Sequence, residues 1–376
     1  MTFSPDGHTA ATASDDRDAR LWAVNDPYHP RLLGILAGHS NSVASVAFSP
    51  DRHTVATASD DQDAALWDVQ DPSHPRLLIS FNGHAGHVVS VAFSSDGRTL
   101  ATASTDGTAR LWHLPGPIVT GHTSTVTSVV FSPDGLTLAT ASVDKTARLW
   151  NIHDPYHPAL LSTLTGHNRE VLSVAFSPHG HTLATASNDQ TERLWDVNDP
   201  SHPKPLGTIS GHNGAVTSVV FSPDGLTLAT ASVDKTARLW DIRDPSDPRP
   251  LGILSGHNGE VRSVAFSPDG HSLATASVDQ TARLWDIRDL HHPALRGTLT
   301  SHNNTVYSVA FSPDKHTLAT GSVDQTVRLW ETSIDNVANR ICSTTLTITN
   351  NEWDQYFPGL SYRPPCPSTT RLSGHR

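Results

Sequence analysis

Short hydrophobic runs separated by turn residues recur along almost the whole chain. In one copy, Val261–Phe266 and Ser272–Ser277 are runs of β-branched, aromatic and small residues, and residues 281–286 form a third run. Ser-Pro-Asp-Gly at 267–270 separates the first two runs, with proline and glycine in the places typical of a type I turn. An aliphatic run at 251–254 follows a proline-containing connector. The pattern predicts four short antiparallel strands per copy and no helix.

Each copy also carries a fixed set of polar and aromatic residues. Eight of the nine tryptophans recur with the copies: Trp22, Trp67, Trp112, Trp150, Trp195, Trp240, Trp285 and Trp330. Seven of them follow a histidine (His39, His84, His122, His167, His212, His257, His302) and an aspartate (Asp61, Asp106, Asp144, Asp189, Asp234, Asp279, Asp324). The interval is 22 residues from histidine to aspartate and six from aspartate to tryptophan in all seven copies. Four-stranded copies at this period predict a β-propeller, which closes radially and leaves few exposed strand edges.

These copies resemble WD40 repeats. The resemblance is carried by the Gly-His opening, by the aspartate six residues before the tryptophan, and by Trp-Asp at 67–68, 195–196, 240–241 and 285–286. It extends over about residues 3–331, with variants such as Trp112-His113 and Ser301-His302. The resemblance implies an all-β WD40 β-propeller in which each blade holds a hydrogen-bonded tetrad.

The tetrad of the copy that ends at Trp285 is expected to contain His257, Ser277, Asp279 and Trp285. Successive strands run in opposite directions, so His257, before the first strand, and Asp279, after the second, lie at the same end of the blade. A buried aspartate there needs hydrogen-bond donors, and the imidazole can supply one. Histidine, serine and aspartate are also the residues of a hydrolytic triad. A catalytic site is used once, whereas this set recurs seven times at constant spacing, so we interpret it as structural.

Positions that vary between copies are free to serve a partner. Three such positions are the residue after the valine that opens the innermost strand, the residue two places earlier, and the residue just before the frame aspartate. The alternating strand directions place all three at the mouth of the channel. They supply the predicted protein-binding rim: Glu170, Leu172, Glu260, Arg262, Tyr307, Val143, Val233, Val278 and Val323. A mixture of apolar and charged side chains is typical of a contact surface. The alternative interpretation is ordinary surface variation. The family resemblance adds that this face of WD40 propellers commonly binds proteins or peptides.

The number of blades depends on how the two ends of the repeat array meet. We expect seven complete blades (26–332), with residues 31–36 as the outer strand of the blade that ends at Trp330 and residues 1–25 as a partial extra blade. The alternative is eight blades with a defective first one. A third possibility is a fragment whose start codon lies inside a longer array.

The pattern changes after residue 331. Residues 333–342 and 350–357 are predicted as short helices of a C-terminal tail (333–376), and Cys342 and Cys366 are a possible disulfide. Residues 340–342, Glu352-Trp353, Tyr356 and Tyr-Arg-Pro-Pro-Cys at 362–366 resemble the tail of bacterial WD-repeat proteins. Those proteins often carry a signal-transduction ATPase or a helix-turn-helix domain upstream. Residues 371–375 echo the junction between a fourth strand and Gly-His, as a vestige of the repeat or by chance.

The net charge and the composition of the chain argue against several classes of function. Lysine and arginine number 26 against 37 aspartates and glutamates, a net charge of −11 that argues against binding to nucleic acid or an anionic membrane. No apolar run approaches the ~18 residues of a membrane span. The 23 histidines lie mostly on different blades, and no cofactor motif is present, so we expect neither metal nor cofactor. We therefore expect a monomeric, cytoplasmic, non-enzymatic scaffold or sensor for a protein or peptide. An enzyme using the central channel is the alternative, and it would need a single cluster of acids.

Overall fold

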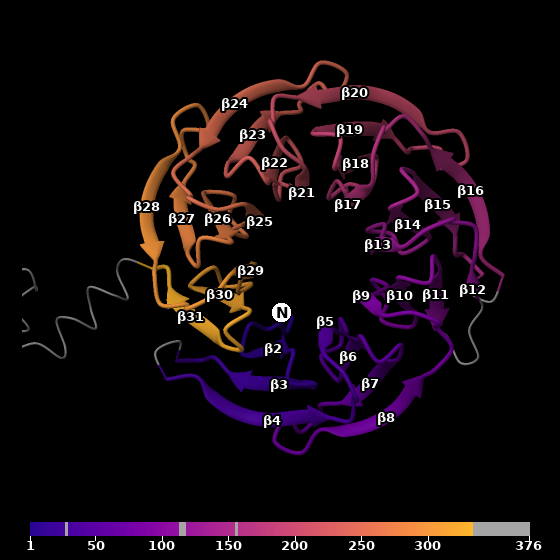
Figure 1. Cartoon of the computed structure of the whole chain (residues 1–376), viewed down its shortest axis with the longest axis vertical. Helices are drawn as coiled ribbons and strands as arrows, with labels where there is room; N and C mark the ends of the chain where they lie inside the picture. Colours follow the sequence, from indigo (N-terminus) through magenta and orange to yellow (C-terminus); the bar gives the residue numbers. More distant parts are fainter. Residues whose placement is uncertain (27–28, 113–117, 155–156, 334–376) are drawn as a thin grey trace, which may run out of the picture.

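A computed structural model describes residues 1–26, 29–112, 118–154 and 157–333, and its strands form eight antiparallel sheets around an open channel (Figure 1). Within each sheet the strands follow one another from the channel outward, as in β25 (Val261–Phe266), β26 (Ser272–Ser277), β27 (Ala282–Asp286) and β28 (Ala294–Leu299). The predicted all-β propeller is confirmed. Within the described ranges, no helix is long and apolar enough to cross a bilayer.

The blades are numbered along the chain. Blade 1 contains β1 (Thr2–Phe3), β2 (Thr9–Ala13), β3 (Asp18–Ala23) and β4 (Arg31–Ala37); blade 2 contains β5 (Val43–Phe48), β6 (Thr54–Ser59), β7 (Ala64–Asp68) and β8 (Arg76–Phe81). Blade 3 contains β9 (Val88–Phe93), β10 (Leu100–Ser104), β11 (Ala109–Trp112) and β12 (Ile118–Val119); blade 4 contains β13 (Val126–Phe131), β14 (Thr137–Ser142), β15 (Ala147–Asn151) and β16 (Ala159–Leu164).

Blades 5 to 8 follow the same order. Blade 5 contains β17 (Val171–Phe176), β18 (Thr182–Ser187), β19 (Thr191–Asp196) and β20 (Lys204–Ser210); blade 6 contains β21 (Val216–Phe221), β22 (Thr227–Ser232), β23 (Ala237–Asp241) and β24 (Arg249–Leu254). Blade 7 contains β25 to β28, and blade 8 contains β29 (Val306–Phe311), β30 (Thr317–Ser322) and β31 (Val327–Glu331).

The preference for seven blades was wrong, and the alternative of eight is confirmed. Residues 31–36 do not join the blade that ends at Trp330, because Arg31–Ala37 pairs with β3 in the register Ala19↔Leu36. The first two strands of blade 1 pair in the register Thr2↔Ala11, so residues 1–25 are part of a four-stranded sheet. A blade therefore does not require a complete His–Asp–Trp frame. The helices expected at 333–342 and 350–357 fall almost entirely outside the described residues.

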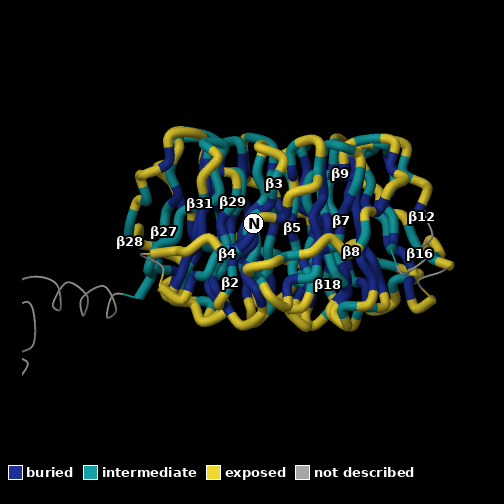
Figure 2. The backbone as a smooth tube through the Cα atoms, turned by 90° about the horizontal axis from the view of Figure 1, so that it is seen from below, coloured by how far each residue is buried: buried dark blue, intermediate teal, exposed yellow. Residues whose placement is uncertain are grey.

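The hydrophobic core lies between neighbouring blades. At the junction of blades 6 and 7, Leu239 and Leu254 pack with Leu273 and Trp285 of the next blade. The same arrangement recurs around the ring, so that the middle of the disc is buried and the loops at its two ends are exposed (Figure 2). Each sheet is thus stabilised by its neighbours, and the variable residues lie at the ends of the disc.

Buried relays and a candidate binding rim

A chain of hydrogen bonds joins four side chains in each of blades 2 to 8. In blade 7, Trp285 Nε1 donates to Thr275 Oγ1 over 3.1 Å, Thr275 Oγ1 lies 2.8 Å from His257 Nε2, and His257 Nδ1 lies 2.8 Å from Asp279 Oδ2. The other six blades repeat these contacts, with the histidine–aspartate distance always 2.8–2.9 Å. We call this arrangement the relay.

Protonation fixes the direction of the relay. Burial raises the pKa of Asp279, but hydrogen bonds from Thr281, His257 and the Asn258 amide outweigh it and lower the pKa to about 2. Burial lowers the pKa of His257, and Asp279 offsets part of that effect. At neutral pH the aspartate is therefore ionised and the imidazole is neutral. Nδ1–H donates to the carboxylate, Nε2 accepts from the threonine hydroxyl, and the threonine oxygen accepts from the indole.

The predicted tetrad contained the wrong hydroxyl. Ser277 Oγ donates to the Gly259 carbonyl over 3.1 Å and accepts from the Asp279 amide, so this serine holds the turn and takes no part in the relay. Threonine lies ten residues before every tryptophan and serine lies eight before it. Periodicity alone could not distinguish the two, because both recur in all copies and lie on the same strand. The structure brings together the predicted histidines, aspartates and tryptophans, with threonine as the fourth member.

The third strand contributes an arginine that the sequence analysis missed. Arg283 Nη2 donates to the Gly256 carbonyl over 2.7 Å, and Arg193 makes the same contact with Gly166. The arginine thus fastens the Gly-His loop of its own blade. Its signal in the sequence is its recurrence two residues before the tryptophan, with Ala65 as the exception.

Glu192 is the second residue that the sequence analysis missed. It occupies a position in β19 that is alanine in blades 1 to 4, 6 and 7. The side chain is 0% exposed, neither carboxyl oxygen has a hydrogen-bond partner, and Oε1 lies 3.8 Å from Nε2 of His212 in the next blade. Burial raises its pKa to about 8, and the nearby Thr230 hydroxyl offsets only part of that rise. The junction of blades 5 and 6 therefore holds a protonated acid at neutral pH.

A β-bulge in the innermost strand positions the rim residues. In blade 7 the register passes from Val261↔Ser277 to Ser263↔Ala276, so Arg262 is the bulged residue, and Tyr307 is its equivalent in blade 8. Bulges commonly redirect a side chain next to a functional surface. The Val278 amide donates to the Glu260 carbonyl over 2.9 Å, so these two predicted rim residues lie next to each other.

The rim residues form one cluster and several separate contacts. Glu260 forms an ion pair with Arg262, whose guanidinium lies 5.9 Å from the centre of the Tyr307 ring. Tyr307 is 55% exposed. Glu170 accepts a hydrogen bond from Asn188 within blade 5. The remaining predicted rim residues are partly exposed and lie on separate blades: Leu172, Val143, Val233, Val278 and Val323.

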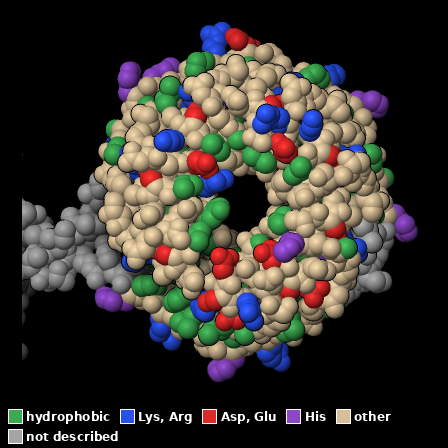
Figure 3. Space-filling model, in the orientation of Figure 1, with side chains coloured by type: hydrophobic (Ala, Val, Ile, Leu, Met, Phe, Trp, Pro, Cys, Tyr) green, Lys and Arg blue, Asp and Glu red, His purple; other side chains and the backbone are tan. Residues whose placement is uncertain are grey.

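A hollow opens beside this cluster at the seam between blades 8 and 1. Its volume is about 530 Å³, and its wall includes Tyr307 and Val323 from blade 8 and Asp15, Asp16 and Trp22 from blade 1. Figure 3 shows the ring face-on, with hydrophobic, acidic and basic side chains around the channel opening. The rim therefore combines an exposed aromatic ring, an arginine and a nearby concave surface.

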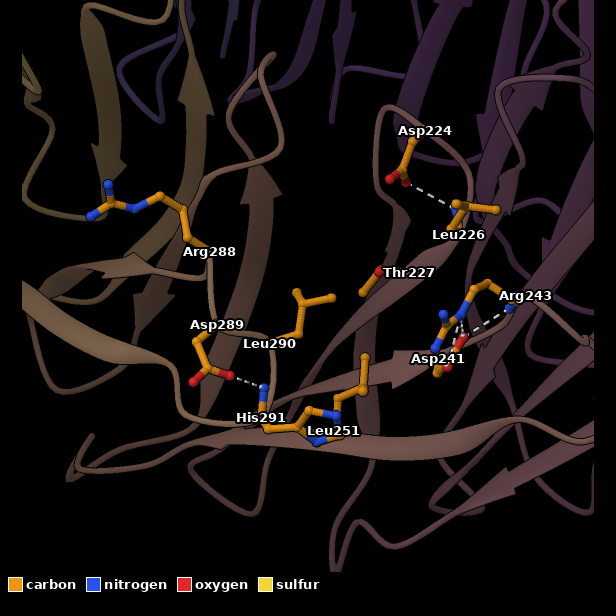
Figure 4. A pocket seen from close by; sticks show the side chains of 10 residues that line it. All are labelled: Asp224, Leu226, Thr227, Asp241, Arg243, Leu251, Arg288, Asp289, Leu290 and His291. Atoms are coloured by element: carbon orange, nitrogen blue, oxygen red, sulfur yellow. Dashed lines mark hydrogen bonds and ion pairs between the residues drawn. The ribbon is translucent and has the colours of Figure 1, made fainter.

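The central channel and the outer wall have fewer free polar or charged groups than the rim. A channel region of about 640 Å³ is lined by valine, alanine, phenylalanine, proline and serine from blades 4 to 8. A hollow of about 430 Å³ between blades 6 and 7 contains Arg243 paired with Asp241, and Asp289 accepting from the His291 amide (Figure 4). The two arginines of that hollow, Arg243 and Arg288, are each paired with the aspartate two residues before them.

No set of three or more potential metal ligands converges within the described parts of the chain. The connector histidines pair with their own aspartates instead, as in His74 Nδ1 at 2.8 Å from Asp71. The possible disulfide between Cys342 and Cys366 falls outside the described residues.

Comparison with known families gives one result for the whole ring. The family model described as WD domain, G-beta repeat (WD40) matches residues 1–23, 30–68, 75–113, 115–151, 158–196, 203–241, 248–286 and 294–331. The matched segments correspond to the eight blades. No curated protein matches the chain.

Proposed function

Because the chain belongs to the WD40-repeat family, whose propellers are typical protein–protein interaction scaffolds, we propose that it is a non-enzymatic scaffold or sensor that binds a protein or peptide at its rim. The supporting observation is the cluster of Glu260, Arg262 and Tyr307 beside the seam hollow. Tyrosine and arginine dominate the energetics of protein interfaces, because both combine a large apolar area with polar groups. The hollow next to them provides room for a partner side chain.

An enzyme that uses the central channel is the competing proposal. It would require acids, bases or nucleophiles in the channel wall, and the channel region of blades 4 to 8 is lined mainly by apolar side chains. The recurring histidines and aspartates are buried in the relays, where their hydrogen bonds are already used. These observations favour the scaffold.

The setting of this activity is a further part of the proposal. Resemblance of residues 340–366 to the tails of bacterial WD-repeat proteins supports a role in bacterial signalling. A cytoplasmic location and a monomeric state are part of the same proposal. The same resemblance supports the alternative that the propeller and the tail (333–376) are the C-terminal part of a larger signal-transduction ATPase regulator. Light scattering on the purified chain tests the monomeric state.

The rim proposal is tested by affinity capture with an Arg262→Glu/Tyr307→Ala variant. Leu226→Ala is the matched control, because Leu226 is an exposed hydrophobic residue in the turn between the first two strands of blade 6, away from the rim. We expect the native chain and the control to retain a partner that the rim variant loses, followed by a tenfold or greater loss of affinity for the purified partner, the scale of one interface hot spot. Equal recovery of every partner by all three proteins would contradict the proposal.

A further inference from the structure

Four of the loops that hold a relay histidine carry an asparagine directly after it. These asparagines are Asn168, Asn213, Asn258 and Asn303, in blades 5 to 8. Each backbone amide donates to the relay aspartate of its own blade over 2.9–3.0 Å, as Asn258 does to Asp279. All four side chains are exposed, and none of them makes a hydrogen bond to the described part of the chain. The four asparagines therefore share one environment.

The residue that follows the asparagine divides the four loops into two pairs. Gly214 and Gly259 follow it in blades 6 and 7, whereas Arg169 and Asn304 follow it in blades 5 and 8. The amide nitrogens of Gly214 and Gly259 donate no hydrogen bond to the described residues. Because glycine has no Cβ, its nitrogen can approach the side-chain amide carbon of the preceding asparagine without steric hindrance. Blades 6 and 7 thus place an unpaired backbone nitrogen beside an unrestrained side-chain amide.

We propose that Asn213 and Asn258 are sites of spontaneous deamidation through a cyclic imide. The nitrogen of Gly259 loses its proton and forms a bond to Cγ of Asn258, while the bond from Cγ to the side-chain nitrogen breaks and ammonia leaves with that proton. Water then opens the ring at one of its two carbonyl carbons. Opening at Cγ yields aspartate, and opening at the main-chain carbonyl carbon yields isoaspartate. Water is the co-reactant, and no atom changes its oxidation state. Asn213 reacts in the same way with Gly214.

A third Asn-Gly pair, Asn82 and Gly83, differs in how its side chain is held. With its nitrogen toward Asp63, the Asn82 side-chain amide donates to both carboxyl oxygens over 3.0 and 3.1 Å. Hydrogen bonds to a charged group are stronger than those between neutral groups, and these two must break before Cγ reaches the Gly83 nitrogen. We therefore expect Asn82 to react more slowly than Asn213 and Asn258 in the folded chain.

Isoaspartate lengthens the main chain by one carbon in a loop that is fixed on both sides. The Asn258 amide donates to Asp279 over 2.9 Å, and Ser277 Oγ donates to the Gly259 carbonyl over 3.1 Å. A Cβ on Gly259 would lie 2.6 Å from the Asp279 nitrogen, so the loop has no space for an added atom. The longer loop is therefore expected to break one of these bonds and to shift Glu260 at the rim.

Both products also add a negative charge beside the rim. A carboxylate at position 258 lies in the loop between the relay aspartate and the ion pair of Glu260 with Arg262. Like charges in this loop repel each other, and the new carboxylate competes with Glu260 for the guanidinium. Conversion of Asn258 is therefore expected to weaken the binding of a partner. This effect rests on the proposed function of the rim, whereas the deamidation itself does not.

Peptide mapping by mass spectrometry on the full, folded chain tests the proposal. The chain is incubated in isotopically labelled water at mildly alkaline pH, which favours loss of the amide proton, and is then digested in ordinary water. We expect Asn213 and Asn258 to exchange the amide nitrogen for labelled oxygen, with isoaspartate among the products. Conversion of Asn82 is expected to be at least about tenfold slower, because its bonds to the Asp63 carboxylate must open first. Asn168 and Asn303 are expected to lag as well, because a side chain follows each of them.

Two substitutions provide matched variants. Arg169→Gly gives the exposed loop of blade 5 the same Asn-Gly pair and is expected to raise the conversion of Asn168 to that of Asn258. Asn213→Gln/Asn258→Gln keeps both amides but moves them one carbon away from the backbone, which disfavours ring closure. After incubation, the native chain is expected to melt about 1–3 °C lower than before, and the double glutamine variant is expected to keep its melting temperature.

Equal conversion of the four relay-loop asparagines would show that the following glycine does not determine the reaction, and would overturn the proposal. Intact Asn213 and Asn258 in the folded chain, under conditions in which the same chain converts both in urea, would also overturn it. Conversion at both positions with unchanged capture of a partner would support the deamidation sites and count against the proposed function of the rim, so the two failures are distinguishable.

Discussion

The relay threonine is the residue on which two buried partners depend. Thr275 accepts from Trp285 and donates to His257, both of which are buried. A buried polar group without its partner destabilises the folded state by about 1–3 kcal/mol. The shape of threonine therefore matters less at this position than its hydroxyl.

Thr275→Val is expected to lower the free energy of unfolding by about 2–4 kcal/mol, because it leaves an indole N–H and an imidazole nitrogen without partners. Ser277→Ala removes two hydrogen bonds in the adjacent turn and is expected to cost about 1 kcal/mol. Urea unfolding of both variants, followed by tryptophan fluorescence, compares the two. A larger loss in Ser277→Ala would mean that the serine, and not the threonine, joins the relay.

Glu192 gives the molecule a pH dependence of its own. Its pKa is about 8 in the folded chain, against 4.5 for an unperturbed glutamate. The folded state therefore binds one more proton than the unfolded state between these values. The protonated residue contributes stability that is complete below pH 4.5 and is lost as the pH rises through about 8.

Glu192→Ala, which restores the residue of six other blades, is expected to stabilise the chain at pH 9 by a few kcal/mol, at about 1.4 kcal/mol per unit of pKa shift, and to have less effect at pH 5. Glu192→Gln removes the ionisable group but keeps the size of the side chain. It is expected to reduce the loss of stability that the native chain shows at alkaline pH. Melting curves between pH 5 and 9 provide the measurement. A native chain that gains stability from pH 6 to 9 relative to both variants would contradict this account of Glu192.

At the scale of the elements, the tight turns between the second and third strands share one backbone conformation. Lys145, Lys235 and Gln280 have φ values between 70° and 74°, and Gly107 has 80° at the same place. A side chain in this left-handed region costs about 1 kcal/mol relative to glycine. Blade 3 is thus relaxed at a turn where the other blades are strained.

Lys235→Gly is therefore expected to leave stability unchanged or raise it by up to about 1 kcal/mol, whereas Gly107→Lys is expected to lower it by at least about 1 kcal/mol. Lys235 is exposed, but Gly107 is buried, and a Cβ there would lie 3.1 Å from the Ser124 carbonyl oxygen, which adds a steric cost. Thermal unfolding measures their difference. A loss of stability in Lys235→Gly that exceeds the loss in Gly107→Lys would show that the lysine side chain stabilises its turn.

The sequence predicted most of the elements because each blade repeats the same strands, turns and frame residues. It did not predict how the ring closes, because Thr2 and Phe3 are too short a run to be recognised as a strand, yet they pair with β2. It placed Ser277 where Thr275 belongs, because both recur in every copy. Glu192 was missed because it departs from the repeat at one position, and only the packing of blades 5 and 6 gives that departure a consequence.

At the scale of the whole molecule, closure rests on contacts between the two ends of the repeat array. Phe3, Ala10 and Val24 of blade 1 form a buried cluster with Ala319 of blade 8, to which Met1 and Leu329 add. The turn that contains Gly7 packs against Pro313. The seam therefore has the same arrangement as the other junctions, with fewer buried residues.

Spin-label distance measurement across the seam tests the closed eight-bladed ring most directly. Labels replace His8 in blade 1 and His316 in blade 8, and a reference pair replaces His271 and His316 in the adjacent blades 7 and 8, with Cys342 and Cys366 changed to serine in both proteins. All three histidines are exposed and occupy equivalent turns. The account predicts that the two pairs give the same short, narrow distance distribution. A longer or broader distribution for the pair at 8 and 316 would show that blades 1 and 8 are not neighbours, and would contradict it.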